Sequence, residues 1–285
     1  MPQFPPEVYA LIDAAIAEDQ TFNDPTTAAV VPPEIRGVGM LRAKSHGVLA
    51  GVEVGLAVFR RVEPELELEA LLPDGAALAP GDGIARVAGP AAGILQAERI
   101  ALNFMQRMSG IASLTNRYVR AVEGTRSRIV DTRKTAPGHR YLDKYAVRAG
   151  GGYNHRYNLA DGILIKDNHI EANRFREMGL RQVIELALER ASHTIRVEVE
   201  VESLEAAREA LDAGAHIIML DNMPVDMMRE AMGFIGDKAV VEASGGINFD
   251  TVRAVAETGV HLISIGELTH SMSALDISLD LEFEQ

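Results

Sequence analysis

The chain has 285 residues, of which 47% are hydrophobic and 24% are charged, a composition typical of a globular protein with one large or two modest domains. It has no cysteine, which excludes disulfides and thiolate metal sites and is typical of a cytoplasmic protein. The net charge of −13 argues against a nucleic-acid partner, and the sequence has neither a signal-peptide pattern nor an apolar run of about 20 residues.

The first third of the chain mixes helical and strand-like patterns. Apolar residues at helical spacing predict an amphipathic helix over residues 8–16. A long helix is predicted to begin near Gln96, with an apolar stripe that continues to Leu114. Runs bounded by proline- and glycine-rich turns predict strands at residues 38–43, 66–72 and 84–88.

The rhythm changes near residue 110, where short apolar strands begin to alternate with helices. Such alternation is typical of parallel strands in βα units. About 145 residues are too few for an eight-stranded barrel, so we predict a reduced α/β barrel of about seven strands, one of them near Tyr153–Arg156. The other predicted strands are 128–131, 162–166, 195–201, 216–221, 239–243 and 261–266, and the helices are 180–191, 204–213, 225–233 and 249–259.

Each of these six strands carries or ends in residues that a hydrophobic core disfavours. Strand C-termini of a parallel barrel share one mouth, where active sites form, so we expect these residues to meet there. They are Asp131–Lys134, Lys166–His169, Glu198 with Glu200, Asp221–Asn222, Ser244–Gly246 and Gly266.

The chemistry expected at this mouth is anion binding. Residues 126–166 contain nine lysines and arginines against three aspartates, a local charge of +6, although a solvated basic face is the alternative reading. Glu200 and Asp221 follow neighbouring strands and suit Mg²⁺, whereas outside a barrel Glu200 would be a solvated acid. Ser244–Gly246 precedes a helix and suits a phosphate, although a tight turn is the plainer reading. No HExxH-like pair of histidines predicts zinc.

Several sequence blocks resemble quinolinate phosphoribosyltransferase, also called nicotinate-nucleotide pyrophosphorylase (carboxylating). The resemblance covers residues from about 20 to 280. The blocks are QAERIALNFMQRMSGIAS (96–113), DTRKTAPGHR (131–140), KYAVRAGGGYNHR (144–156), LIKDNHI (164–170), EVEVESLEAA (198–207), IIMLDNM (217–223), EASGGIN (242–248) and SIGELTHS (264–271).

This resemblance implies a two-domain fold and a reaction. The fold would be an N-terminal α/β open sandwich, residues 1–110 joined by the tail 271–285, and the incomplete barrel of type II phosphoribosyltransferases, residues 111–270. The reaction would transfer phosphoribosyl from phosphoribosyl pyrophosphate to quinolinate with decarboxylation, giving nicotinate mononucleotide, pyrophosphate and CO₂. The protein would be a homodimer or larger, with Arg99 reaching into a neighbouring subunit's site.

The resemblance also implies a role for individual residues. Those expected at quinolinate are Arg99, Thr132, Arg133, His155, Arg156 and Lys166. Those expected at phosphoribosyl pyrophosphate are Lys134, Ser244, Gly245, Gly246, Ile265, Gly266, Glu267 and His270. Lys134, Lys166, Glu200 and Asp221 are expected to be catalytic, with the two acids also holding Mg²⁺.

Two alternatives remain open at this point. A paralogue without decarboxylation is disfavoured by the intact Asn154-His155-Arg156 and Lys166–His169 blocks. A catalytically silent phosphate-binding barrel would be expected to have lost a metal carboxylate or a lysine, and none is lost.

Overall fold

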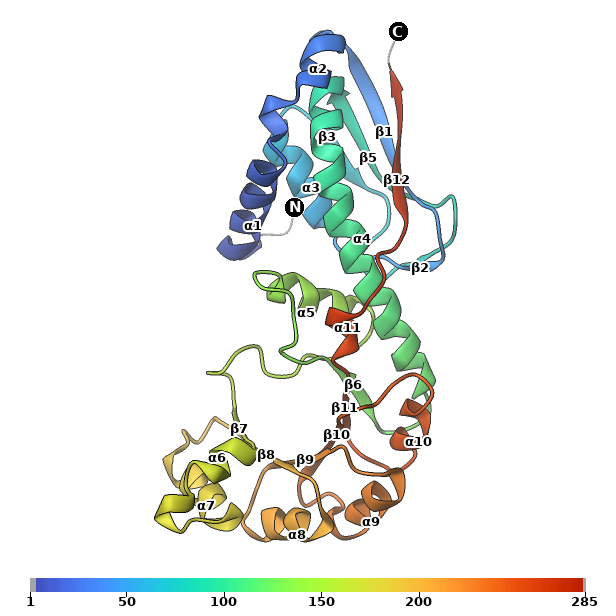
Figure 1. Ribbon diagram of the computed structural model, residues 1–285. Helices are drawn as coiled ribbons and strands as arrows, with labels where there is room; N and C mark the ends of the chain where they lie inside the picture. The colour runs from blue at the N-terminus through green and yellow to red at the C-terminus, as the bar shows by residue number, and fades with distance from the viewer. Residues whose placement is uncertain (1–3, 284–285) are drawn as a thin grey trace. The chain divides into compact units, whose positions relative to one another are not determined.

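The computed structural model describes residues 4–283, which form two compact units (Figure 1). The first unit comprises the chain up to residue 116, residues 135–151 and the chain from residue 268, and the second comprises residues 117–134 and 152–267. We predicted ranges of 1–110 with 271–285, and 111–270. The segment 135–151 therefore belongs to the first unit, although it interrupts the barrel in sequence.

The first unit is built on an antiparallel sheet in the order β12-β1-β5-β3. Leu41, Ile84 and Val87 of this sheet are fully buried, as are Phe59 and Ile94 of the helices. Figure 1 shows helices α1 and α3 and the first part of α4 on one side of the sheet. The strands are β1 (Arg36–Ala43), β3 (Glu67–Ala70), β5 (Gly83–Pro90) and β12 (Ile277–Phe283), with β2 (Gly47–Val48) and β4 (Ala77–Leu78) as a separate pair. The helices are α1 (Pro6–Glu18), α2 (Pro25–Val30), α3 (Val52–Val62), α4 (Ala91–Ala121) and α5 (Arg140–Ala149).

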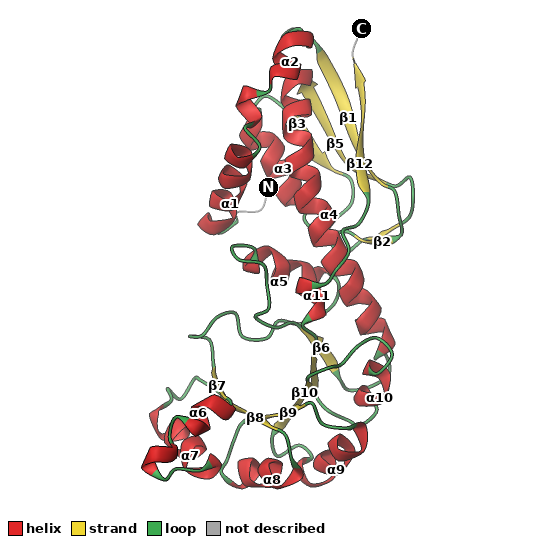
Figure 2. Ribbon diagram, in the orientation of Figure 1, coloured by secondary structure: helices red, strands yellow, loops and turns green. Residues whose placement is uncertain are grey.

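The second unit is an incomplete α/β barrel, as predicted. Its six strands are all parallel and follow the order β6-β11-β10-β9-β8-β7. Figure 2 shows helices α7, α8, α9 and α10 along the outer side of the curved sheet. The strands are β6 (Arg128–Val130), β7 (Ile163–Ile165), β8 (Val197–Val201), β9 (Ile217–Asp221), β10 (Val240–Ser244) and β11 (Leu262–Ser264). The helices are α6 (Asp167–Glu171), α7 (Leu180–Arg190), α8 (Leu204–Asp212), α9 (Val225–Ile235), α10 (Val252–Ala256) and α11 (Glu267–His270), the last of which extends into the first unit.

The seventh strand predicted near Tyr153–Arg156 is reduced to one parallel bridge between Val130 and Tyr153. The other predicted strands are present, most of them one or two residues shorter or longer than expected. The long helix begins at Ala91 rather than near Gln96, and helices α2, α3, α5, α6 and α11 were not predicted. Among the described residues, no helix combines the length and apolarity needed to cross a membrane.

Candidate active site

Strand register brings the polar strand residues to one face of the barrel sheet. Glu200 of β8 lies opposite Met219 of β9, which lies opposite Glu242 of β10. Side chains alternate between faces along a strand, so Asp221 and Ser244, two positions further on, project from that same face. By the same alternation, Leu164 of β7, Lys166 directly after β7 and Ser264 of β11 project from this face too.

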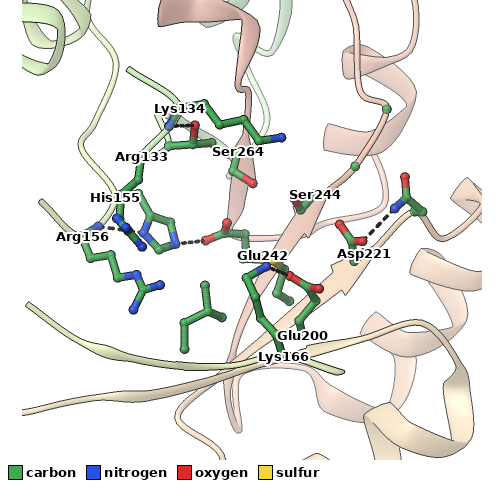
Figure 3. A pocket seen from close by; sticks show the side chains of 16 residues that line it. Arg133, Lys134, His155, Arg156, Lys166, Glu200, Asp221, Glu242, Ser244 and Ser264 are labelled. Atoms are coloured by element: carbon green, nitrogen blue, oxygen red, sulfur yellow. Dashed lines mark hydrogen bonds and ion pairs between the residues drawn. The ribbon is translucent and has the colours of Figure 1, made fainter. Parts of the chain in front are cut away.

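These side chains line a cavity of about 580 Å³ at the carboxyl ends of the strands, the expected end of a parallel barrel (Figure 3). The loop after β6 and the segment before β7 supply the rest of its wall. The cavity is lined by Thr132, Arg133, Lys134, His155, Arg156, Leu164, Lys166, Glu200, Met219, Asp221, Asn222, Glu242, Ser244, Gly245, Gly246 and Ser264.

Two arginines give the cavity a strongly cationic wall. The Arg156 guanidinium is oriented by donating to the backbone oxygen of Gly162 at 2.9 Å. Burial, and then the nearby charge of Arg133, lower the pKa of Arg156, yet a guanidinium stays protonated in proteins. Within the described chain, the buried Nε of Arg133 has no hydrogen-bond partner. Two neighbouring cations with an unsatisfied buried donor form a site suited to a carboxylate or phosphate.

Opposite the arginines lies a pair of carboxylates. Glu200 forms an ion pair with Lys166, and Figure 3 shows the two side chains side by side at one edge of the cavity. Asp221 Oδ2 accepts a hydrogen bond of 2.7 Å from the side-chain amide Nδ2 of Asn222. Mg²⁺ takes one or two protein carboxylates and completes its shell with water and phosphate oxygens. Glu200 and Asp221 fit that ligand set, because both are oxygen donors on the same face of adjacent strands.

A tight loop follows β10. Gly245 and Gly246 have φ angles of +84° and +61°, and Asn222 is also left-handed at +53°. The backbone N–H of Asn222 donates to the backbone oxygen of Ser244 at 2.9 Å. A Cβ atom on Gly245 would lie 2.4 Å from Asn222 Oδ1. The chain can follow this path only with glycine at position 245, and this leaves backbone N–H groups near the cavity for a phosphate.

A largely buried cluster at the cavity wall joins His155 to Glu242, which also lines the cavity, and to Glu198, which does not. The Nε2 atom of His155 lies 3.3 Å from Oε2 of Glu198 and 3.5 Å from Oε2 of Glu242. The side chains of these two glutamates are only 6% and 1% exposed. Burial disfavours the charged imidazole, but hydrogen bonds to Glu198 and Glu242 outweigh this and raise the pKa of His155 to about 10. Burial also raises the pKa of Glu198.

The proton positions within this cluster follow from its contacts. The backbone N–H of Arg156 donates to His155 Nδ1 at 2.7 Å. That contact needs an unprotonated Nδ1, whereas the carboxylates favour the imidazolium. Nε2, which faces Glu198 and Glu242, carries a proton in either form.

Eleven of the predicted site residues line the cavity, including all four expected to be catalytic. Five do not. Arg99 is exposed on α4, and His270 is exposed on α11, both in the first unit. Ile265 is buried and Gly266 is partly buried after β11, and the Glu267 carboxylate accepts a hydrogen bond from Tyr118. The eleven are Thr132, Arg133, Lys134, His155, Arg156, Lys166, Glu200, Asp221, Ser244, Gly245 and Gly246.

The basic stretch 126–166 does not act as one surface. Of its nine cations, Arg133, Lys134, Arg156 and Lys166 line the cavity. Arg126 pairs with Asp237, and Arg128 stacks on the ring of Tyr153. Arg140, Lys144 and Arg148 lie on α5 in the first unit.

Two lining residues, Glu242 and Ser264, were not predicted from the sequence. Asn222 and Glu198 were expected at the barrel mouth without an assigned role, and Asn222 lines the cavity while Glu198 contacts His155. Strand alternation could have indicated Glu242 and Ser264. Glu242 lies two residues before Ser244, and Ser264 lies two residues before Gly266, so each shares a face with a predicted residue.

An incomplete parallel barrel with cations, paired carboxylates and a glycine loop at its strand ends defines an enzyme class that acts on anionic, phosphorylated substrates. Models of the N-terminal and C-terminal domains of quinolinate phosphoribosyl transferase match residues 24–109 and 111–280. The chain therefore belongs to the quinolinate phosphoribosyl transferase family.

Individual relatives agree with this assignment. The chain is 45% identical to a probable nicotinate-nucleotide pyrophosphorylase [carboxylating] of Bacillus subtilis, over 84% of this chain and 81% of that protein. It is 41% identical to the mitochondrial quinolinate phosphoribosyltransferase [decarboxylating] 2b of Nicotiana tabacum, over 95% and 81% of the two chains. The crystal structure of NadC from Streptococcus pyogenes superposes on all of both chains with a TM-score of 0.94 at 40% identity.

Proposed function

We propose that the protein transfers the phosphoribosyl group of phosphoribosyl pyrophosphate to quinolinate and removes CO₂, giving nicotinate mononucleotide and pyrophosphate. The names of its relatives support this reaction, and so does the chemistry of the cavity. The proposal makes the protein a pentosyltransferase that acts on two anionic substrates.

The observation that carries the proposal is the pairing of Arg133 with Arg156 in one wall of the cavity. Two guanidinium groups held close together repel each other until an anion binds between them, and the Arg133 Nε has no partner within the described residues. Quinolinate carries two adjacent carboxylates on a planar ring. Arginine forks bind such groups through two parallel hydrogen bonds and fix their orientation.

The rest of the cavity suits the second substrate. We place the 5′-phosphate at the Ser244–Gly246 loop and the pyrophosphate near Lys134, Glu200 and Asp221. Mg²⁺ held by the two carboxylates would neutralise negative charge on the departing pyrophosphate. Lys166, paired with Glu200 in this structure, would then be released to face the quinolinate carboxylate.

The reaction needs no covalent bond to the protein. The bond from ribose C1 to pyrophosphate breaks, and the electron pair of the pyridine nitrogen forms the new bond to C1. The resulting pyridinium ring accepts the electrons of the bond to its 2-carboxylate, CO₂ departs, and a proton replaces it on that carbon. The chain's contribution is therefore positioning and charge stabilisation.

A turnover assay with quinolinate, phosphoribosyl pyrophosphate and Mg²⁺ tests the function. We expect nicotinate mononucleotide and CO₂ in equal amounts, and no product without Mg²⁺. Product from nicotinate in place of quinolinate, without CO₂, would assign the non-decarboxylating activity. Calorimetric binding of both substrates without any turnover would assign a silent barrel. The expected cytoplasmic location stays a prediction.

A further inference from the structure

The segment that carries His155 and Arg156 takes the place of the missing seventh strand. Within the described chain, this segment pairs with the sheet through the isolated bridge between Val130 and Tyr153. After Tyr153, contacts with side chains hold the segment in place. Asp131 accepts the backbone N–H of His155 at 2.8 Å, and the His155 ring turns toward Glu198 and Glu242.

Both ring nitrogens of His155 are engaged within the protein. Nε2 faces the two glutamates, and Nδ1 lies 2.7 Å from the backbone nitrogen of Arg156, whose N–H it accepts when the imidazole is neutral. Figure 3 shows the imidazole directed toward Glu242 while the Arg156 side chain turns away along the cavity wall. The ring thus connects the buried carboxylates to the backbone of the arginine that we place at quinolinate.

Burying two carboxylates at this place is energetically unfavourable, which suggests that Glu198 and Glu242 have a function. The ligand atoms of all three side chains lie within 4.8 Å of one another. One oxygen of Glu198 and one of Glu242 are buried without a hydrogen-bond partner in the described structure. Two carboxylates so close in a buried site repel each other, and they also repel a dianion bound above them.

We propose that Glu198 and Glu242 are positioning residues that act through the His155 imidazole to hold Arg156 in place for a substrate carboxylate. This inference rests on the proposed function, because it assigns part of the quinolinate affinity to two glutamates that act through His155. Glu242 lines the cavity, but its side chain is only 1% exposed. Glu242 is the better residue to test, since Glu198 lies two positions from the proposed metal ligand Glu200.

The test compares Glu242→Leu and Glu242→Gln with the wild-type protein. We expect E242L to raise the KM for quinolinate about tenfold or more, with the KM for phosphoribosyl pyrophosphate within about twofold. E242Q should retain much of the affinity, because its amide oxygen still accepts the Nε2 proton. Thr258→Val is the matched control. It removes another buried hydrogen bond of the barrel, from the Thr258 hydroxyl to the Val255 oxygen, and should leave both KM values unchanged.

Two further measurements separate positioning from general damage. Amide hydrogen exchange of residues 153–157 in the ligand-free protein should accelerate in E242L and remain slow in T258V. In an Arg156→Ala background, E242L should cause no additional loss of quinolinate affinity, measured as calorimetric binding without turnover, because the arginine through which it acts is gone. If E242L does not fold, Glu242→Ala, which also removes the acceptor of the Nε2 proton, takes its place in both measurements.

Several results would overturn the inference. A lower KM for quinolinate in either variant would mean that the glutamates act as repelling charges. Unchanged exchange at residues 153–157 would remove the link to Arg156. A divalent ion retained stoichiometrically by the purified protein and lost in E242Q would assign the cluster to metal binding. Failure of the wild-type protein to turn over quinolinate would instead defeat the proposed function, and the exchange comparison would still decide the positioning.

Discussion

Arg156 shows how a single side chain in this cavity is specified by its surroundings. Its backbone contacts the His155 ring, its guanidinium donates to Gly162, and the charge of Arg133 stands beside it. A lysine here would keep the backbone contact with His155, but its flexible ammonium would not reproduce the guanidinium contact with Gly162, because lysine lacks the planar fork of arginine.

Replacement of Arg156 by lysine should therefore weaken quinolinate binding although the charge is kept. The loss of one charge-assisted hydrogen bond, about 1.5–3 kcal/mol, predicts a rise of roughly 10- to 150-fold in the KM for quinolinate. Steady-state kinetics with each substrate varied in turn would measure it. Arg126→Lys, at an exposed arginine paired with Asp237, should change neither KM. A twofold effect or less in R156K would contradict the placement of quinolinate here.

The raised pKa of His155 predicts a pH dependence of stability. An unfolded histidine titrates near pH 6.5, whereas the folded cluster holds its proton to about pH 10. The native state therefore binds the extra proton within this window, so the free energy of unfolding should fall as pH rises from about 6.5 to 10.

Denaturant unfolding at several pH values would check this, with His155→Gln expected to flatten the slope. His193→Gln, at an exposed histidine, should retain it. Equal slopes in the wild-type protein and H155Q would place the shared proton on Glu198 rather than on the imidazole.

The cavity residues at strand ends were predictable because their types contradict a buried strand. Lys166, Asp221 and Ser244 interrupt apolar runs at points where parallel strands must end together. Glu242 carried only a weaker signal, the strand face that it shares with Ser244 two residues further on, and nothing in the sequence indicates its partner. The partner, His155, is 87 positions away and is brought near only by the closed curvature of the sheet.

At the scale of elements, the two neighbouring glycines of the loop after β10 differ in the space available for a side chain. Gly246 has 3.8 Å of space to the nearest atom beyond its Cβ position, whereas Gly245 would meet the Asn222 backbone nitrogen at 2.8 Å. The conformation of Asn222 and the loop after β10 thus depend on each other, and Asp221, which we propose as a Mg²⁺ ligand, accepts a hydrogen bond from the Asn222 side chain.

Gly245→Ala should consequently do far more harm than Gly246→Ala. We expect G246A to cost about 1–2 kcal/mol of stability for left-handed backbone, with a modest change in KM for phosphoribosyl pyrophosphate. G245A must displace the loop, and its KM for the same substrate should rise by about tenfold or more. Thermal unfolding and kinetics on both variants make the comparison, and similar effects would contradict the close packing against Asn222.

Helix α5 was missed because charged residues occupy its buried face. Asp143 and Lys144 are buried in the first unit, so the apolar stripe expected of a helix is broken. Arg107 of α4 compensates Asp143 with hydrogen bonds of 3.0–3.1 Å. Pairwise compensation between distant segments leaves no periodic pattern, whereas helices α7 to α9, with apolar inner faces, were predicted within two residues.

Removal of Arg107 should destabilise the first unit by leaving the buried Asp143 carboxylate uncompensated. We expect Arg107→Gln to cost about 3–5 kcal/mol in denaturant unfolding at neutral pH. Burial raises the pKa of Asp143 and Arg107 opposes that rise, so the loss should shrink as pH falls and the carboxyl binds a proton. The double variant R107Q/D143N should recover part of the stability. A loss below about 1 kcal/mol in R107Q would show that the carboxylate is well solvated.

At the scale of the whole molecule, local sequence patterns could not predict that the first unit is assembled from three separate segments of the chain. Residues 135–151 and the chain from residue 268 join it across long sequence separations, and such pairings leave no short-range signal. The parallel barrel was predicted more completely, because its βα units repeat along the chain.

The role expected of Arg99 also belongs to this scale. Arg99 is exposed on α4, which suits a residue that serves a neighbouring copy. We expect Arg99→Ala and Arg156→Ala to be inactive alone, and mixtures refolded or co-expressed to recover about one quarter of wild-type activity, because a mixed dimer restores one complete site. Activity in R99A alone, or no recovery in the mixture, would contradict a site shared between subunits. Glu98→Ala, on the same helix, is the control and should stay active unmixed.

Strand β12 closes the sheet of the first unit by pairing along β1 from Ile277 to Phe283. During synthesis, β1 and β5 leave the ribosome about 190 residues before this partner, an interval of roughly 10–40 s at cellular rates of translation. Throughout that time the outer edge of β1 offers unpaired amide and carbonyl groups to any passing strand. Until β12 has been synthesised, this edge of the nascent chain is therefore open to pairing with the wrong strand.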